Sequence, residues 1–166
     1  QSADPLPPSQ AGAALLAEAV SMAESPGRDP QPVGELPAMA QQISGRTCVV
    51  DVPYGFLHLT LSFPSDDEAN LRVVSSPEWD EGTPYEFAAG LDGIERISRG
   101  PHGIPAAGTG AWLSDDTFVM DVDELGNLDV ARLTFVFDGD AVTITVEDTY
   151  WWEPDPTRVL TGRLQD

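Results

Sequence analysis

Two segments of the sequence combine residue types that are common in active sites. Residues 91–104 read LDGIERISRGPHGI, and residues 110–128 read GAWLSDDTFVMDVDELGNL. Their arginines, histidine and acids could bind an anion, transfer a proton or ligate a metal. Their glycines, prolines and aspartates are also typical of turns. Which interpretation holds decides whether the chain is an enzyme or a binding or accessory domain.

The residues needed for nucleophilic catalysis are missing or badly placed. All eight basic residues are arginines, so the serine–lysine chemistry of S-x-x-K and K-T-G enzymes has no base. No G-x-S-x-G motif occurs. Cys48 lies among apolar residues, where we expect a buried thiol rather than a reactive thiolate. The sequence therefore predicts no catalytic residue and no enzymatic activity of this chain.

Metal and cofactor sites are not predicted either. The two histidines, His58 and His102, are far apart in the sequence and have no zinc-type partner nearby. The segment DVDELGNLD resembles a calcium loop, but Leu125 takes its fifth position and Arg132 its twelfth. A β-hairpin with a solvated acidic tip explains the segment better, so we expect no metal and no cofactor.

The formal net charge of −20 limits the partners of the protein. Such a chain repels phosphate backbones and anionic head groups, so we expect no nucleic-acid partner. No apolar run approaches the roughly 20 residues that span a bilayer, so we expect no membrane insertion. The sequence does not indicate the cellular compartment, because a single cysteine says little about the redox environment.

Two regions differ in composition. Residues 1–42 are rich in Pro, Ala, Gly and Ser, and within them AALLAEAVSMAES predicts a short amphipathic helix over about residues 12–24. We expect this region to be a linker with too little apolar surface to fold alone. Because the chain begins at Gln1 without a methionine, we expect a mature form or part of a longer protein.

From Ile43 to the end, apolar and polar residues alternate with a period of two. Residues 56–63 are the clearest example, and the whole region predicts about nine or ten short strands. Asp138-Gly139 favours a tight hairpin turn, and no long helical pattern interrupts the series. For residues 43–166 we therefore predict an all-β domain: a closed antiparallel up-and-down, lipocalin-like barrel of about eight strands. A β-sandwich is the alternative.

Aromatic and basic side chains mark a candidate surface for a ligand or for another domain. Tryptophan combines apolar area with a hydrogen-bond donor, and Arg96 and Arg99 can neutralise neighbouring acids. Packing in the core or at the rim is the more frequent role of such aromatics. The candidate surface comprises Trp79, Arg96, Arg99, His102, Trp112, Trp151 and Trp152.

The same region also carries a recognisable overall pattern, in LPAMAQQISGRTCVVDV, GFLHLTLSF, residues 90–127 and VLTGRL. Over about residues 36–164 it resembles the C-terminal lipocalin-like domain of bacterial serine hydrolases of the β-lactamase and penicillin-binding type. The resemblance implies a non-catalytic accessory domain, partnered by an N-terminal catalytic domain of the same chain. Such a domain would contribute stability, active-site restriction or oligomer contacts, and homo-oligomers remain open. Cys48 departs from the pattern, which often has an aromatic there.

A second hypothesis is a free-standing barrel that binds a small apolar ligand. The proline-rich start of the chain favours the accessory domain over this alternative. The modest aromatic content of 8% also speaks against a ligand, as does alternation clean enough to fill a narrow barrel with side chains. A catalytic domain with S-x-x-K and K-T-G motifs, encoded directly upstream, would decide between the two.

The excess of negative charge leads to a prediction about salt. Twenty-eight carboxylates against eight arginines should cost folding free energy through self-repulsion, which salt screens over about 8–10 Å. We expect the melting temperature to rise as sodium chloride increases from about 10 mM to several hundred mM. A flat or falling melting temperature would show that the acids are already compensated in the folded state.

Overall fold

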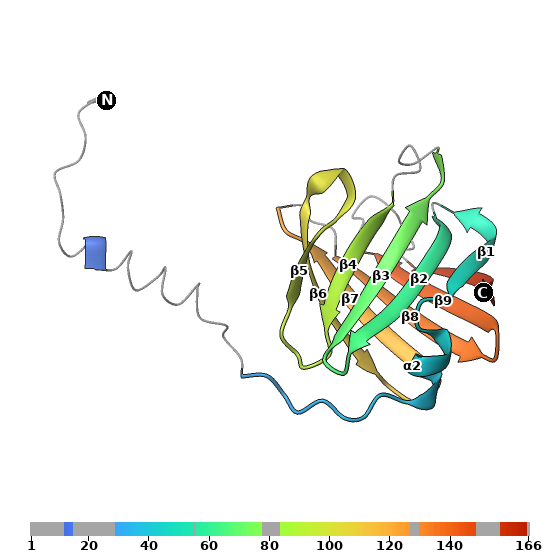
Figure 1. Cartoon of the computed structure of the whole chain (residues 1–166). Coiled ribbons are helices and arrows are strands. Elements are labelled where there is room, and N and C mark those ends of the chain that lie inside the picture. The colour runs from blue at the N-terminus through green and yellow to red at the C-terminus, as the bar shows by residue number, and fades with distance from the viewer. Residues whose placement is uncertain are drawn as a thin grey trace. The chain divides into compact units, whose positions relative to one another are not determined.

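A computed structural model describes residues 12–14, 29–54, 56–77, 84–126, 130–148 and 157–165. The chain divides into two compact units, residues 1–30 and residues 31–166. In the first unit residues 12–14 are helical, and the rest of the helix predicted for residues 12–24 lies outside the described residues. The second unit holds the β-structure (Figure 1).

The second unit consists of one short helix, ten strands and a 3₁₀ turn. In chain order these are α2 (Ala38–Ile43), β1 (Thr47–Tyr54), β2 (Phe56–Ser65), β3 (Glu68–Ser75), β4 (Tyr85–Gly90), β5 (Arg96–Arg99), η1 (Pro101–Gly103), β6 (Pro105–Trp112), β7 (Thr117–Glu124), β8 (Val130–Asp138), β9 (Ala141–Asp148) and β10 (Thr157–Gln165). The tight turn predicted at Asp138-Gly139 joins β8 to β9, and Gly139 has a positive φ of 58°.

The strands form a single sheet in the order β4-β3-β2-β1-β10-β9-β8-β7-β6-β5. The sheet closes where β4 and β6 pair in parallel at Gly90 and Thr109. Nine strands make the closed ring, and β5 pairs with β6 beside the junction. The predicted all-β closed barrel is thus confirmed, and the β-sandwich is excluded. The ring has nine strands rather than eight, because alternation cannot show which strands take part in closure.

Glycine makes the closure of the ring sterically feasible. A Cβ atom added at Gly108 would overlap the backbone carbonyl oxygen of Ala88 on β4. The inward face of β6 carries only small residues around this point, Ala106, Gly108 and Gly110. Strands β4 and β6 therefore approach too closely for a side chain to lie between them.

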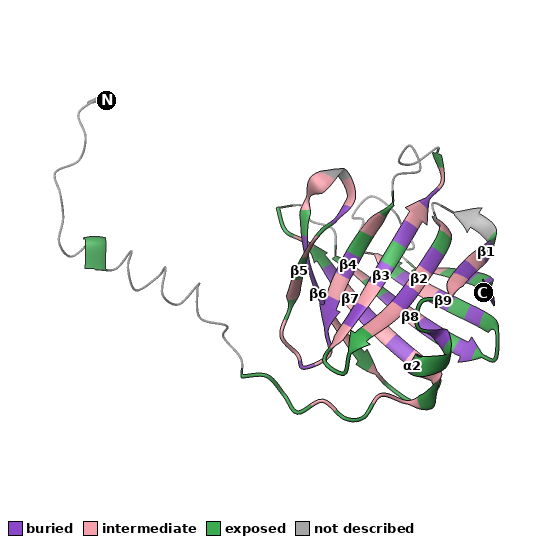
Figure 2. Cartoon of the chain, in the orientation of Figure 1, coloured by how far each residue is buried: buried purple, intermediate pink, exposed green. Residues whose placement is uncertain are grey.

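The interior of the barrel is filled with side chains. Buried residues, shown in purple, alternate with less buried ones along most of the strands (Figure 2), as expected when alternate side chains point inward. The side chains of Leu71, Phe118, Met120 and Ile144 are each 0% exposed, so no space large enough for a water molecule adjoins them. This agrees with the expectation of a narrow barrel packed with its own residues.

Helix α2 lies at one end of the barrel, which we call the α2 end. Ile43 on this helix is 1% exposed and belongs to the core. In the same part of the barrel Phe63 packs against Trp112 and Phe118, with ring centroids 5.5 and 5.4 Å away. The backbone N–H of Phe63 donates to the Ser44 hydroxyl at 3.0 Å, which fixes the end of the helix to β2. No helix among the described residues is long and apolar enough to cross a membrane.

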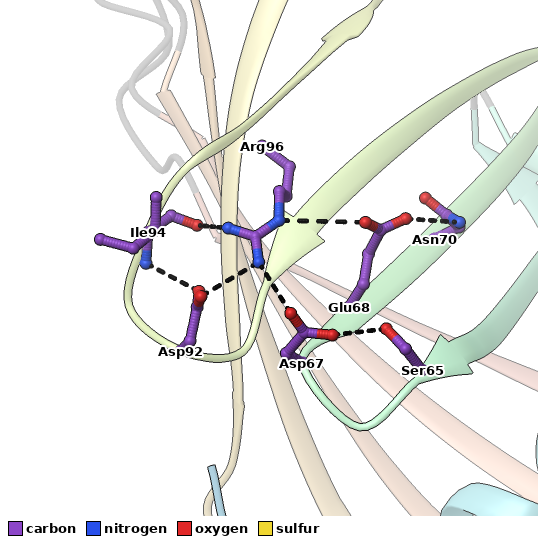
Figure 3. Close-up of polar contacts among 7 residues, drawn as sticks. All are labelled: Ser65, Asp67, Glu68, Asn70, Asp92, Ile94 and Arg96. Atoms are coloured by element: carbon purple, nitrogen blue, oxygen red, sulfur yellow. Dashed lines mark hydrogen bonds and ion pairs between the residues drawn. The ribbon is translucent and has the colours of Figure 1, made fainter. Parts of the chain in front are cut away.

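A partly buried ion-pair cluster, which we call the Arg96 cluster, fastens the corner between β4 and β5 at the α2 end (Figure 3). The Arg96 guanidinium donates to the Ile94 carbonyl at 2.9 Å and to the Asp92 carboxylate at 3.1 Å. It also lies 3.4 Å from the Asp67 carboxylate and 3.9 Å from that of Glu68. Arg96 therefore neutralises neighbouring acids, as the sequence predicted.

Asp92 is the most enclosed acid of the Arg96 cluster, with only 10% of its side chain exposed. It accepts hydrogen bonds from Arg96 and from the Ile94 N–H, and these hold its pKa below the usual range of an aspartate. Gly90 leaves the necessary room, since a Cβ there would lie 2.8 Å from the Arg96 guanidinium. The cluster thus serves the fold, by holding the corner next to the closure.

Adding one methyl group at the closure should destabilise the barrel. We expect Gly108→Ala to lower the free energy of unfolding by about 3 kcal/mol, because β4 or β6 must move to accommodate the Cβ. Chemical denaturation monitored by tryptophan fluorescence measures this. Gly34→Ala is the control, since nothing lies within 4 Å of a Cβ there. Equal stability of the two variants would contradict the steric account of closure.

Neutralising Asp92 should also destabilise the fold, in a pH-dependent way. We expect Asp92→Asn to cost about 1–2 kcal/mol near pH 7, because Arg96 loses its most buried charged acceptor. The folded-state pKa of Asp92 is lowered, so its contribution is present above the unfolded pKa of about 3.9 and is lost as the pH falls through the folded pKa. The difference between wild type and variant should therefore shrink below about pH 4.

The control for Asp92 is Asp121→Asn. Asp121 accepts two hydrogen bonds from Arg132, at 2.7 and 2.8 Å, but this pair is exposed to solvent. We expect a change below about 1 kcal/mol, as for other surface ion pairs. Urea unfolding of both variants between pH 7 and pH 3 provides the comparison. If the free energy of unfolding differed between wild type and Asp92→Asn by the same amount at every pH in this range, the stabilisation would not depend on ionisation of Asp92.

Candidate functional site

The end of the barrel opposite α2, which we call the distal end, has a different character. Strands β3, β7 and β9 finish here, and β4, β8 and β10 begin here. Some inward-facing residues near this end are partly exposed, among them Tyr85, Glu124 and Asp148, whereas Ala106 and Ser75 are buried.

An apolar layer forms the floor of the distal end. Its members are inward-facing residues of four strands, and all are nearly buried, to the same degree as Leu61 and Leu164 toward the α2 end: Phe87 (9%), Leu133 (5%), Val146 (7%) and Leu160 (8%). Leu133 pairs with Val146 across β8 and β9, so these two side chains are neighbours on the inner face. This layer supplies the apolar contact area that a small ligand would need.

Polar groups lie next to the apolar layer on β3 and β4. The hydroxyl of Ser75, a buried residue, donates to the Tyr85 hydroxyl at 3.4 Å. Tyr85 packs edge-on against Phe87, with ring centroids 5.3 Å apart. A tyrosine with an apolar contact on one side and a hydroxyl on the other is well suited to the rim of a binding site.

Three charged residues also face inward at the distal end. Glu124, Asp148 and Arg158 continue the inward rows of β7, β9 and β10, beyond Val122, Val146 and Leu160. Each of the three is partly buried, whereas the adjacent outward residues Asp123, Glu147 and Val159 are exposed.

Charged side chains directed into the barrel are costly unless they have partners. Glu124, Asp148 and Arg158 each interact with other residues. They are the functional candidates that the sequence interpretation missed. The alternation of buried residues that precedes Glu124 and Asp148, and that follows Arg158, was the signal that could have found them.

The candidate surface predicted from the sequence is only partly described. Arg96 and Trp112 lie toward the α2 end, and Arg99 lies at the distal end of β5. His102 lies in η1, but its side chain is outside what the structure describes. The remaining members also lie outside the described residues: Trp79, Trp151 and Trp152. The structure therefore does not bring the three described side chains to one place.

Cys48 has no reactive environment. It is a buried core residue on β1, and burial raises the pKa of its thiol to about 11, with a smaller contribution from the negative charge of Asp51. A thiol with so high a pKa is not a nucleophile near neutral pH. Within the described part of the chain, no group of three or more His, Cys, Asp or Glu residues could hold a metal ion.

Comparisons with known proteins give structural neighbours but no sequence relatives. No protein-family model matches the chain. No curated protein matches it either. Among solved structures, a Schistosoma mansoni fatty acid binding protein in complex with arachidonic acid matches with a TM-score of 0.56 at 10% identity, over 76% of this chain and 98% of that one.

Two further neighbours have the same fold. Fatty-acid-binding protein 1 of Echinococcus granulosus matches with a TM-score of 0.54 at 13% identity, over 76% of this chain and 99% of that one. As-p18, an extracellular fatty acid binding protein, matches with a TM-score of 0.52 at 12% identity, over 80% of this chain and 100% of that one. At this level of identity the likeness establishes the fold alone.

These neighbours correct the interpretation of the overall sequence pattern. They are fatty-acid-binding proteins, not accessory domains of bacterial serine hydrolases, so the resemblance to that domain was wrong. The prediction that an N-terminal catalytic domain is the partner is therefore wrong as well. The physical reason is that the alternation and turn residues of a closed barrel recur in different families of barrels. What the comparisons support is the fold, a small barrel shared with these fatty-acid-binding proteins.

Proposed function

We propose that residues 43–166 form a non-catalytic binding domain for a small, largely apolar molecule held at the distal end. The observation that carries this proposal is the apolar layer of Phe87, Leu133, Val146 and Leu160, which lies beside the hydroxyls of Ser75 and Tyr85. The structural neighbours support it, because their names describe them as fatty-acid-binding proteins. Residues 1–30 are then a linker to this domain, whereas residues 31–42, which include most of α2, belong to the same compact unit as the barrel.

The filled interior limits the depth of binding. Leu71, Phe118, Met120 and Ile144 leave no space between the apolar layer and the α2 end. A ligand enclosed deep within the barrel would have to displace these side chains, at a cost of several kcal/mol. The proposed ligand therefore sits against the apolar layer and remains in contact with the rim.

A binding role also agrees with the chemistry of the chain. A base of the serine–lysine type is absent from the sequence, and the only cysteine is a buried thiol with a raised pKa. The structural neighbours are described by what they bind and not by a reaction. The side chains at the distal end can supply apolar contacts, hydrogen bonds and charge, which are the elements of a binding site.

Binding can be tested with an uncharged fluorescent probe such as N-phenyl-1-naphthylamine. We expect saturable binding to the full chain, and at least about tenfold weaker binding to Val146→Trp, whose larger side chain would occupy the apolar layer. The matched control is Val159→Trp, because Val159 is 63% exposed and faces outward. Equal affinities of the two variants would contradict a site at the distal end.

A second measurement uses the wild-type protein, so its result does not depend on whether Val146→Trp folds. In the wild-type protein, the probe should shift the methyl NMR signals of Val146 and Leu160, while those of Leu61 and Leu164, in the half nearer α2, should stay in place. Shifts confined to Leu61 and Leu164 would locate the site at the α2 end instead.

A further inference from the structure

We infer that the free edge of strand β5 binds the same edge of a second copy of this chain, so that two barrels share one continuous sheet in a symmetric dimer. This inference goes beyond the proposed function and does not depend on the ligand site at the distal end. It comes from the backbone of β5, which has a strand partner on one side, and from the side chains along its other edge.

Strand β5 is the last strand of the sheet order, and it lies at the left margin of the barrel in Figure 1. It pairs with β6 from Arg96, opposite Gly108, to Arg99, opposite Pro105. Within the described part of the chain, no strand pairs with its other edge, since β4 pairs with β6 instead, at Thr109. Unpaired strand edges of this kind are places where another chain can add a strand.

The β5–β6 hairpin shows which backbone groups face the free edge. The Gly100 N–H donates to the Ile104 carbonyl at 2.8 Å, in the register that the two strands share. Successive residues of an antiparallel strand direct their N–H and C=O groups to opposite sides, so Ile97 and Arg99 direct theirs away from β6. Pro105, which has no N–H to donate, lies opposite Arg99, in agreement with this phase.

The exposed side chains along this edge follow the order acid, apolar residue, base. Glu95, Ile97 and Arg99 are spaced by two, so their side chains share one face of the strand. All three are exposed, Ile97 by 62%. Among the described residues neither Glu95 nor Arg99 has an ion-pair partner, whereas Arg96 between them is held by Asp92. The edge therefore offers one acid and one base to another chain.

This order of side chains is complementary to itself when the strand direction is reversed. If a second copy of β5 runs antiparallel with Ile97 opposite Ile97, Glu95 of each copy lies opposite Arg99 of the other. Cross-strand pairs of opposite charge and of apolar side chains both stabilise an antiparallel sheet. The same alignment brings the outward N–H and C=O groups of all three residues opposite one another. Backbone and side chains thus favour one register.

Other registers lack this agreement. A shift by two residues places Ile97 opposite Arg99 and leaves Glu95 without a base. A shift by four places Arg99 opposite Arg99, or Glu95 opposite Glu95, which like-charge repulsion disfavours. The charges therefore select a symmetric pairing centred on Ile97. Because the two copies use the same surface, the pairing closes at a dimer.

The net charge and the small contact area set the strength of the dimer. Two copies of net charge −20 repel each other, and salt at physiological concentration screens this repulsion over about 8 Å. One short strand from each copy gives an interface at the small end of the known range. We therefore expect a dissociation constant of about 100 µM in about 150 mM salt.

Sedimentation equilibrium of the full chain from about 10 to about 500 µM measures this association. We expect the wild type to shift from monomer to dimer and to form no larger species. Ile97→Pro should remain monomeric, because it removes the central N–H, and it should fold, because that N–H faces away from β6. A wild type that stays monomeric throughout, or an Ile97→Pro variant that dimerises as the wild type does, would contradict the inference.

Two charge reversals test the register, and they do so even if Ile97→Pro fails to fold. Glu95→Arg leaves two bases on the edge and Arg99→Glu leaves two acids, so neither variant can pair with itself without like-charge repulsion. In a mixture, each base of one variant lies opposite an acid of the other. We expect each variant alone to dimerise at least about tenfold more weakly than the wild type, and the equimolar mixture to recover the wild-type affinity.

The control for net charge is Glu147→Arg, which reverses an exposed acid on β9. Glu147→Arg and Glu95→Arg both change the net charge from −20 to −18, so overall repulsion alone would make both dimerise slightly more tightly than the wild type. We expect this of Glu147→Arg and the opposite of Glu95→Arg. If the two variants dimerise equally, or if the mixture shows no recovery, the paired edge is wrong, and the proposed ligand site is unaffected.

Discussion

The contact between β4 and β6 is the constraint on which the rest of the barrel depends. The two strands pair at Gly90 and Thr109, and Gly108 lies against the backbone of Ala88. Without this approach the sheet would be open, with β4 exposing its backbone hydrogen-bonding groups. Because the ring is closed, its circumference fixes the interior volume, and the inward residues must fill that volume. The Arg96 cluster holds the adjoining corner in the geometry that closure requires.

The filled interior is the reason why the proposed binding site lies at the rim. Large side chains such as Phe118 and Met120 occupy the space that a deeply bound ligand would need. What remains is the distal end, where an apolar layer meets inward-facing charges such as Glu124 and Asp148. A charged group at this boundary interacts more strongly than one in water and still avoids the full cost of burial. If the proposed binding role holds, the rim residues would select the ligand.

The sequence predicted those features that depend on local pattern. Alternation over residues 56–63 and the Asp138-Gly139 turn identified strands, hairpins and the closed antiparallel barrel. Closure at Gly108 was not predictable, because it joins strands that do not follow one another in the chain. Glu124 was assigned to a solvated acidic tip, since only the register of β7 separates it from the exposed Asp123. The resemblance to accessory domains failed because strand and turn patterns describe a barrel and not its ligand.

The pairing of the first and last strands has a practical consequence. Thr47 at the start of β1 lies opposite Gln165 at the end of β10, so the chain enters and leaves the barrel side by side at the α2 end. A few added residues could therefore join these two points, and the turn at Gly139 could be cut to give a circular permutant. A fusion partner or surface tether attached at either point would begin at the α2 end. The distal end would then face away from the attachment, as an immobilised sensor requires.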